Sequence, residues 1–124
     1  MQEDPLSEQV IGCAFRVLNT LGCGFLEKVY ENALVHECRK SGLGVQTQVR
    51  ITVEYDGEVV GDYVADLLVE DRLLVELKAA RALDSVHVAQ AINYLKATKV
   101  PACLLLNFGN PRLEIRRLLL GNHR

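Results

Sequence analysis

The sequence has no hydrophobic segment long enough to cross a membrane, because its longest apolar runs are four or five residues. It also lacks an opening stretch of basic, apolar and small residues that would mark a secretion signal. No low-complexity tract or internal repeat interrupts a composition with 49% apolar and 24% charged residues. We therefore expect one globular domain over residues 1–124, with no membrane partner.

The sequence also lacks a CxxC pair, and its cysteines at positions 13, 23, 38 and 103 are scattered without metal-ligand spacing. This arrangement predicts buried free thiols in a reducing compartment, and therefore a cytoplasmic protein. An excess of positive charge is missing as well, since the net charge is −2 and the isoelectric point is near 5.9. This balance argues against a protein that coats nucleic acid through bulk charge, but it does not exclude a local basic groove or a site with bound cations.

Periodicity predicts two helices, three strands, a third helix and two further strands. Apolar residues recur at helical spacing over 5–20 and 25–40, with Asp4-Pro5 as a start signal and Gly42 as a stop signal. Side chains alternate from Gln48 to Tyr55, and Asp56-Gly57 predicts a hairpin turn. The remaining elements are expected at 58–69, 73–79, 85–98, 102–108 and 113–119. The order ααβββαββ predicts an α/β domain with a mixed β-sheet flanked by helices.

Charged residues inside the apolar stretch LLVELKAA, residues 73–80, need an explanation because buried charges are costly. If residues 70–72 form a turn, Val69 pairs with Leu73, and counting back places Asp66 opposite Glu76. Two carboxylates would then face each other about 5 Å apart at Cβ. Lys78, two residues further along, would project from the same face.

Two facing carboxylates require a shared proton, a basic partner or a divalent cation. Lys78 can neutralise only one charge, whereas Mg²⁺ held by both carboxylates, with water and substrate phosphate, balances the rest. This chemistry predicts metal-assisted hydrolysis of a phosphodiester, with Lys78 orienting water or stabilising charge on the phosphate. The alternative is a structural ion pair, with Asp66 at a wet edge and Glu76 and Lys78 solvated.

The spacing D–x9–ExK resembles the PD-(D/E)XK nuclease superfamily, although Ala65 stands where some members have proline. A more extensive resemblance is to the small bacterial GxxExxY proteins, a group within that superfamily. The naming motif is present as GFLEKVY at residues 24–30. The segments YVADLLVEDRLLVELKA, HVAQAINYLKAT and LLLNFG follow in the order of that group's blocks. The resemblance implies a restriction-endonuclease-like core.

The resemblance also implies roles for individual residues. Asp66 and Glu76 would be catalytic metal ligands, with the Leu77 carbonyl and Glu27 as further donors to Mg²⁺ or Mn²⁺, and Lys78 would be the catalytic lysine. Gln90 and Tyr94 match a QxxxY motif of one branch, and their i, i+4 spacing places them on one helix face. We expect Gln90 to act in catalysis. We expect substrate contacts from Gln90, Tyr94, Tyr30 and His87. For Tyr30 and Tyr94 packing is the alternative, and for His87 a helix cap.

These observations predict a Mg²⁺-dependent nuclease that hydrolyses DNA, or alternatively RNA, through metal-activated water. One rival is a non-catalytic nucleic-acid-binding or assembly module that keeps the fold, and another is a phosphate-ester hydrolase for small molecules. The presence of Glu27, Asp66, Glu76, Lys78 and Gln90 together favours the enzyme. A domain of this size has little surface to enclose a duplex, so we expect a homodimer or a larger protein partner.

Overall fold

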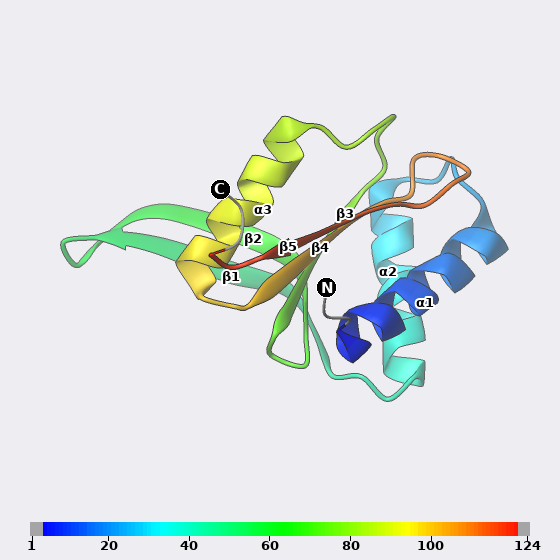
Figure 1. Ribbon diagram of the computed structural model, residues 1–124, viewed down its shortest axis with the longest axis horizontal. Helices are drawn as coiled ribbons and strands as arrows, with labels where there is room; N and C mark the ends of the chain where they lie inside the picture. Colours follow the sequence, from blue (N-terminus) through cyan, green and yellow to red (C-terminus); the bar gives the residue numbers. More distant parts are fainter. Residues whose placement is uncertain (1–3, 122–124) are drawn as a thin grey trace.

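A computed structural model describes residues 4–121 of the protein, and its elements follow the predicted order (Figure 1). The first two helices are α1 (Pro5–Leu21) and α2 (Glu27–Lys40). The strands β1 (Val45–Tyr55), β2 (Glu58–Val69) and β3 (Leu73–Lys78) come next. The remaining elements are α3 (Ser85–Thr98), β4 (Ala102–Asn107) and β5 (Glu114–Leu119). None of the helices within residues 4–121 has the length and apolar character that a bilayer crossing requires.

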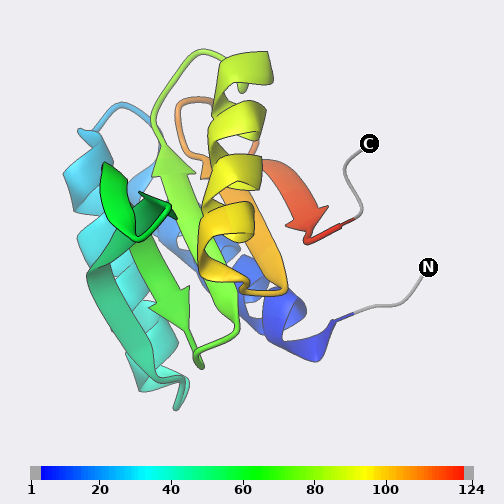
Figure 2. The same cartoon turned by 90° about the vertical axis from the view of Figure 1, so that its left-hand side faces the viewer.

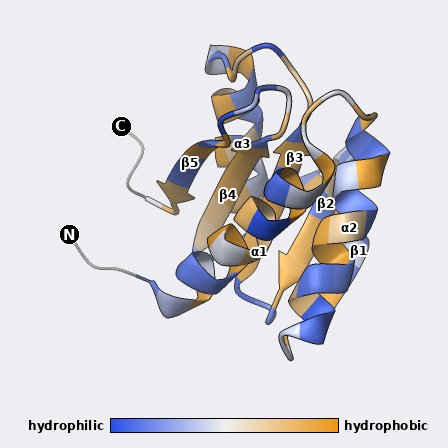
Figure 3. Ribbon diagram, turned by 90° about the vertical axis from the view of Figure 1, so that its right-hand side faces the viewer, coloured by the Kyte–Doolittle hydropathy of each residue, from blue (hydrophilic) through white to orange (hydrophobic). Residues whose placement is uncertain are grey.

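The strands form one five-stranded sheet in the order β1-β2-β3-β4-β5. Only β3 and β4 are parallel, because α3 connects them, and the other neighbours are antiparallel. Helices α1 and α2 cover one face of the sheet, and α3 covers the other (Figures 1, 2 and 3). The predicted α/β class with a mixed sheet flanked by helices is confirmed.

Two element boundaries differ from the sequence prediction by more than one residue. Helix α2 begins at Glu27 rather than at residue 25, because Gly24 has a φ of 117° and Leu26 is extended. Strand β1 begins at Val45, three residues before Gln48, because Val45 pairs with Val69 at the far end of β2. Pairing with a partner strand thus extends β1 beyond the segment that alternates in sequence.

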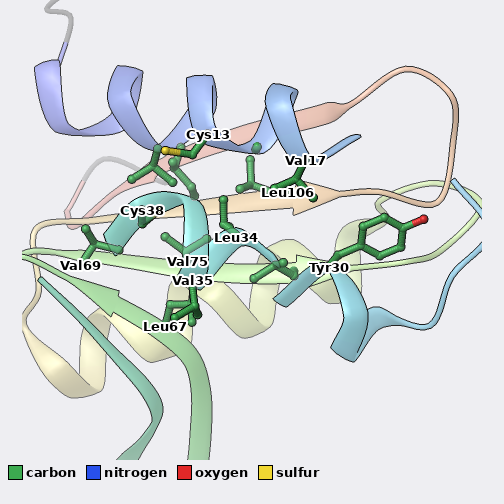
Figure 4. Packing of buried hydrophobic residues seen from close by; sticks show 14 of the residues in the cluster. Cys13, Val17, Tyr30, Leu34, Val35, Cys38, Leu67, Val69, Val75 and Leu106 are labelled. Atoms are coloured by element: carbon green, nitrogen blue, oxygen red, sulfur yellow. The ribbon is translucent and has the colours of Figure 1, made fainter. Parts of the chain in front are cut away.

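The core consists of two apolar layers, one on each side of the sheet. Figure 4 shows the layer under α1 and α2, in which Val17 and Leu34 meet Leu67, Val75 and Leu106 of three strands. The second layer lies under α3 and contains Ile51, Ala65, Leu74, Ala91, Tyr94, Leu95, Cys103, Leu105 and Leu118. Burial of both layers accounts for the near-continuous apolar character of β3 and β4.

The cysteines are free, as predicted, but one of them is not buried. Cys13, Cys38 and Cys103 lie in the core, and burial raises the pKa of the Cys103 thiol. The prediction of burial is wrong for Cys23, which is exposed in the turn between α1 and α2. Gly22 and Gly24 on either side have positive φ, and the whole turn from Gly22 to Leu26 is exposed.

The side-chain alternation of β1 and β2 changes phase at one shared position. In β2, Ala65 packs in the layer under α3, whereas Leu67 packs in the layer under α1 and α2. A regular strand would place residues two apart on the same face. Opposite this point, Gln48 of β1 has a φ of 52°, which is uncommon for a residue with a side chain. The sheet is therefore distorted at the level of Asp66.

Candidate active site

Two carboxylates fill a gap between β2 and β3. The predicted register is confirmed, since Val69, Leu68 and Leu67 pair with Leu73, Leu74 and Val75. Beyond Leu67 the paired register ends, and side chains replace the backbone ladder. The amide of Asp66 donates to Oε2 of Glu76 at 2.7 Å, and the amide of Leu77 donates to Oδ2 of Asp66 at 2.9 Å.

The two carboxylates therefore reach across between the strands rather than standing side by side on one face. Each uses one oxygen to replace a lost backbone hydrogen bond. The other two, Oδ1 of Asp66 and Oε1 of Glu76, have no hydrogen-bond partner among the described residues. No buried side-chain oxygen is left unpaired in that part of the chain, so both of these oxygens reach solvent. Their position leaves them available to an incoming ligand.

Burial and repulsion by neighbouring carboxylates raise the pKa values of Asp66 and Glu76 in this gap. Burial, followed by the negative charge of Asp66, raises the pKa of Glu76 to about 8, and Glu76 is only 4% exposed. Burial also raises the pKa of Asp66, while the Leu77 amide lowers it and the charge of Glu31 adds to the rise. Lys78 lowers both pKa values but does not offset the other contributions. The site has an excess of negative charge that favours a cation.

Glu27 is the first residue of α2, and it is exposed. Partial desolvation raises the pKa of Glu27, the charge of Asp66 raises it further, and Lys78 lowers it. The carboxylate of Glu27 therefore interacts electrostatically with Asp66 and with Lys78. The N-terminus of a helix also favours a negative side chain. Glu27, Asp66, Glu76 and Lys78 therefore act on one another electrostatically, and we call these four residues the charged cluster. Their joint action as a site stays a prediction.

The other two residues of the GxxExxY motif fix the position of Glu27. Gly24 has a φ of 117°, which residues with a side chain rarely adopt. The Tyr30 hydroxyl donates to the Gly22 carbonyl at 2.6 Å and accepts from the Phe25 amide at 3.1 Å. The ring of Tyr30 is fully buried and stacks on Phe108 at 4.9 Å. Tyr30 thus supports the turn that aims Glu27, and its burial keeps it from touching a substrate.

Asn107 and Gly109 hold the end of β3, where Lys78 lies. The Asn107 side chain, fully buried, accepts from the amides of Ala80 and Gly109 at 3.0 Å and donates to the Ala80 carbonyl at 3.0 Å. The Phe108 amide donates to the Lys78 carbonyl at 2.8 Å. A Cβ on Gly109 would overlap the Ala80 backbone, so this close approach requires glycine. The LLLNFG segment, residues 104–109, therefore fixes the backbone that follows Lys78. We call these contacts of Asn107, Phe108 and Gly109 with residues 78–80 the clamp.

Glu31 lies behind the charged cluster. It is buried, and its carboxylate accepts from the Lys28 ammonium at 3.1 Å and from the Gln48 amide at 2.9 Å. Gln48 is the residue with positive φ at the distortion of β1. Its hydrogen bond to Glu31 links α2 to the sheet at the level of Asp66.

His87, Gln90 and Tyr94 of α3, which were predicted to contact the substrate, occupy different surroundings. Tyr94 is buried, and its pKa is raised by burial and by the charges of Glu76 and Asp66, so it lies near the carboxylates. Gln90 is half-buried, and no hydrogen bond ties its amide to the described residues. The Nδ1 atom of His87 accepts from the Asp84 amide at 3.2 Å in a capping box. His87 thus forms the helix cap that was its alternative role.

The donor set at the gap fits Mg²⁺ better than a metal enclosed by protein. Among residues 4–121, no three His, Cys, Asp or Glu side chains gather closely enough to surround an ion. Mg²⁺ is commonly held by one or two carboxylates, with waters and substrate phosphate completing its coordination. The solvent-facing oxygens of Asp66 and Glu76 would supply such a pair.

The sequence prediction missed Glu31, Gln48, Asn107 and Gly109. Glu31 follows Glu27 by one helical turn, and that spacing was a signal for a shared surface. Asn107 interrupts an apolar run, and a buried amide needs partners. Gln48 gave no signal, because nothing in a glutamine indicates a positive φ.

The mixed sheet, with an acid on each of two adjacent strands and a lysine two residues beyond the second acid, defines the restriction-endonuclease-like class of protein. Solved structures agree with this fold. The protein SSO0001 superimposes with a TM-score of 0.60 at 17% identity, covering 76% of this chain and 50% of that chain. This chain therefore spans half the length of SSO0001.

A second structure is an alkaline exonuclease, LHK-Exo, from Laribacter hongkongensis. It superimposes with a TM-score of 0.57 at 12% identity, covering 98% of this chain and 73% of that chain. Its complex with dAMP gives a TM-score of 0.52 at 14% identity, covering 94% and 83%. At these identities the likeness concerns the fold. No curated protein matches the sequence significantly.

The chain belongs to the PD-(D/E)XK nuclease superfamily, since the sequence model of that superfamily matches residues 4–118. The matched region contains the charged cluster, the segment HVAQAINYLKAT of α3 and the segment LLLNFG that includes the end of β4. It also contains the motif GFLEKVY at the start of α2.

Proposed function

We propose that the protein is a metal-dependent nuclease of the GxxExxY group that hydrolyses phosphodiester bonds in DNA. The observation that carries the proposal is the strand gap. Asp66 and Glu76 each use one oxygen for a backbone amide and present the other to solvent, next to Lys78. Membership of a nuclease superfamily supports a hydrolytic enzyme.

Asp66 and Glu76 would hold Mg²⁺ or Mn²⁺ through their solvent-facing oxygens, with the Leu77 carbonyl as a further donor. Glu27 does not gather with them closely enough to form a three-acid site, so it would contribute through a water molecule on the ion. The bound cation would polarise the phosphate and lower the pKa of a water molecule. Lys78 would orient the attacking water and balance the negative charge that develops on the phosphate. The backbone amides of Asp66 and Leu77 keep both carboxylates in place throughout.

A polar hollow beside the charged cluster supports a nucleic-acid substrate. It has a volume of about 440 Å³, lies between α2 and β1, and includes Glu31 of the site. Lys28, His36 and Arg39 bring cationic or titratable groups to it. Such groups position a phosphate backbone without reading its sequence. The net charge of −2 of the whole chain is compatible with a local contact of this kind.

The test of catalysis is cleavage of labelled single- and double-stranded DNA and RNA with and without Mg²⁺. Lys78→Ala should lower the rate at least about a hundredfold, as expected for loss of a group that acts in proton transfer or charge stabilisation. Lys40→Ala, at the exposed end of α2, is the matched control and should cleave like the wild type. Equal cleavage by the Lys78 and Lys40 variants would refute the proposed role of Lys78.

The test of the metal site uses thermal unfolding. Mn²⁺ or Mg²⁺ should raise the Tm of the wild type, because a ligand that binds only the folded state stabilises it. Asp66→Asn should remove most of this shift, whereas Asp62→Asn on the exposed hairpin should keep it. A cation-induced shift of the same size in both variants would exclude Asp66 as a ligand.

The second candidate function is a non-catalytic nucleic-acid-binding or assembly module. DNA binding by the wild type, with no cleavage under any cation, would favour it. A homodimer or larger partner and a cytoplasmic location also stay predictions, the latter supported by the free cysteines.

A further inference from the structure

A groove opens between the β1–β2 hairpin and α3, on the side of the sheet away from α2. Its volume is about 320 Å³, at the small end of the range for sites that bind small molecules. Figure 2 shows α3 and the hairpin on this side of the molecule. The lining residues are Val53, Tyr63, Asn93, Tyr94, Lys96 and Ala97.

Two tyrosine rings form the aromatic part of this groove. The ring centroids of Tyr63 and Tyr94 lie 5.8 Å apart at an interplanar angle of 50°. Tyr94 is buried, but Tyr63 is 46% exposed, so much of its ring is in contact with water. An exposed ring supported from behind by a second ring offers a flat apolar surface for stacking. Such surfaces bind bases of single-stranded nucleic acids, because every base has a π-face.

The groove adjoins the charged cluster. The negative charges of Glu76 and Asp66 both act on the Tyr94 hydroxyl, and Tyr63 contributes as well. The side chain of Glu76 leaves β3 on the α3 side, since Leu74, two residues before it, packs in that layer, and its carboxylate turns from there into the strand gap. A nucleotide with its phosphate at the carboxylates can therefore extend its base toward Tyr63.

We propose that this groove binds an unpaired nucleobase next to the phosphate that is cleaved, so that the substrate is single-stranded nucleic acid. The proposal rests on the nuclease function above. In a duplex, both faces of a base are stacked, and the base must leave the stack before a side chain can contact its face. The lining contains one ammonium group, from Lys96, so the groove suits a base better than a run of phosphates.

The polar groups at the groove define how a nucleotide would sit. Lys96 and Asn93 are exposed and lie on the same side of α3, where an ammonium and an amide can contact a phosphate oxygen and a base edge. Neither contact requires a particular base, so the groove predicts stacking with little sequence preference.

The experiment measures binding of a fluorescent single-stranded oligonucleotide by anisotropy, in EDTA so that no cleavage occurs. Tyr63→Ala should weaken binding roughly tenfold, because loss of one stacking partner commonly has an effect of this size. Tyr63→Phe should bind like the wild type, since the ring is kept. Tyr55→Ala is the matched control: Tyr55 is 72% exposed near the hairpin turn, lies outside the groove, and should not alter binding.

A second oligonucleotide distinguishes binding of a base from binding of the phosphate backbone. An oligonucleotide with abasic sites keeps the backbone but removes the bases, so it should bind the wild type and Tyr63→Ala equally. A similar loss of affinity for the normal and the abasic oligonucleotide would assign the groove to the backbone and overturn the proposal. Unchanged affinity of Tyr63→Ala for the normal oligonucleotide would also overturn it and would leave the groove to another class of ligand.

Cleavage assays distinguish failure of this proposal from failure of the nuclease function. If the wild type cleaves, Tyr63→Ala should raise KM for single strands with little change in kcat. Cleavage with identical KM for Tyr63→Ala and Tyr55→Ala would refute the base groove while the nuclease function stands. Absence of cleavage, with weaker binding by Tyr63→Ala alone, would support the groove and refute the nuclease function.

Discussion

Glu76 makes the stability of this protein depend on pH in a direction opposite to that of most carboxylates. Its pKa rises from an ordinary 4.5 to about 8 in the folded chain. The folded protein therefore keeps a proton on Glu76 that the unfolded chain has released. The stability from this group is fully present below pH 4.5 and is lost as the pH rises through 8.

The size of this loss of stability follows from the pKa shift of Glu76. Each pKa unit corresponds to about 1.4 kcal/mol, so raising the pH from about 5 to about 7.5 should remove about 3 kcal/mol of stability. For a domain of this size, that loss lowers the Tm by roughly 10 °C. Glu76→Gln keeps an oxygen for the Asp66 amide but carries no charge, so it should lose this pH dependence.

The assay is urea denaturation of the wild type and Glu76→Gln at several pH values in EDTA. The difference in unfolding free energy between the two proteins should change by about 3 kcal/mol across this range. Glu58→Gln, on the exposed side of the hairpin turn, is the control and should follow the wild type. Parallel plots of unfolding free energy against pH for the wild type and Glu76→Gln would show that the surroundings do not raise the pKa of Glu76. Mg²⁺ should reduce the wild-type loss at the higher pH, because it favours the ionised pair.

Other substitutions test the support of the site. Tyr30→Phe should lower the unfolding free energy by about 1–3 kcal/mol, since it removes both hydrogen bonds of the hydroxyl, whereas Tyr55→Phe should have no effect. Asn107→Ala should cost about 2–4 kcal/mol in urea denaturation, because it leaves buried backbone groups without partners, and a cost below about 1 kcal/mol would contradict the clamp. A thiol reagent should label Cys23 rapidly in the folded protein, and rapid labelling of Cys103 would contradict its burial.

The sequence by itself determined the elements and their order, and it predicted a site of Glu27, Asp66, Glu76 and Lys78. Periodicity and turn residues act over a few positions, so they can be read without knowing the partners. The hairpin register could also be counted, because a three-residue turn after Val69 leaves one pairing.

Only the tertiary structure decided how the acids are arranged. Alternation in β2 predicted two carboxylates on one face, but the distortion at Gln48 and the end of the register at Leu67 turn them into the gap between strands. The burial of Glu31 and the clamp at Asn107 likewise depend on segments far apart in sequence. Contacts of this kind arise from packing between elements, and local sequence patterns do not contain them.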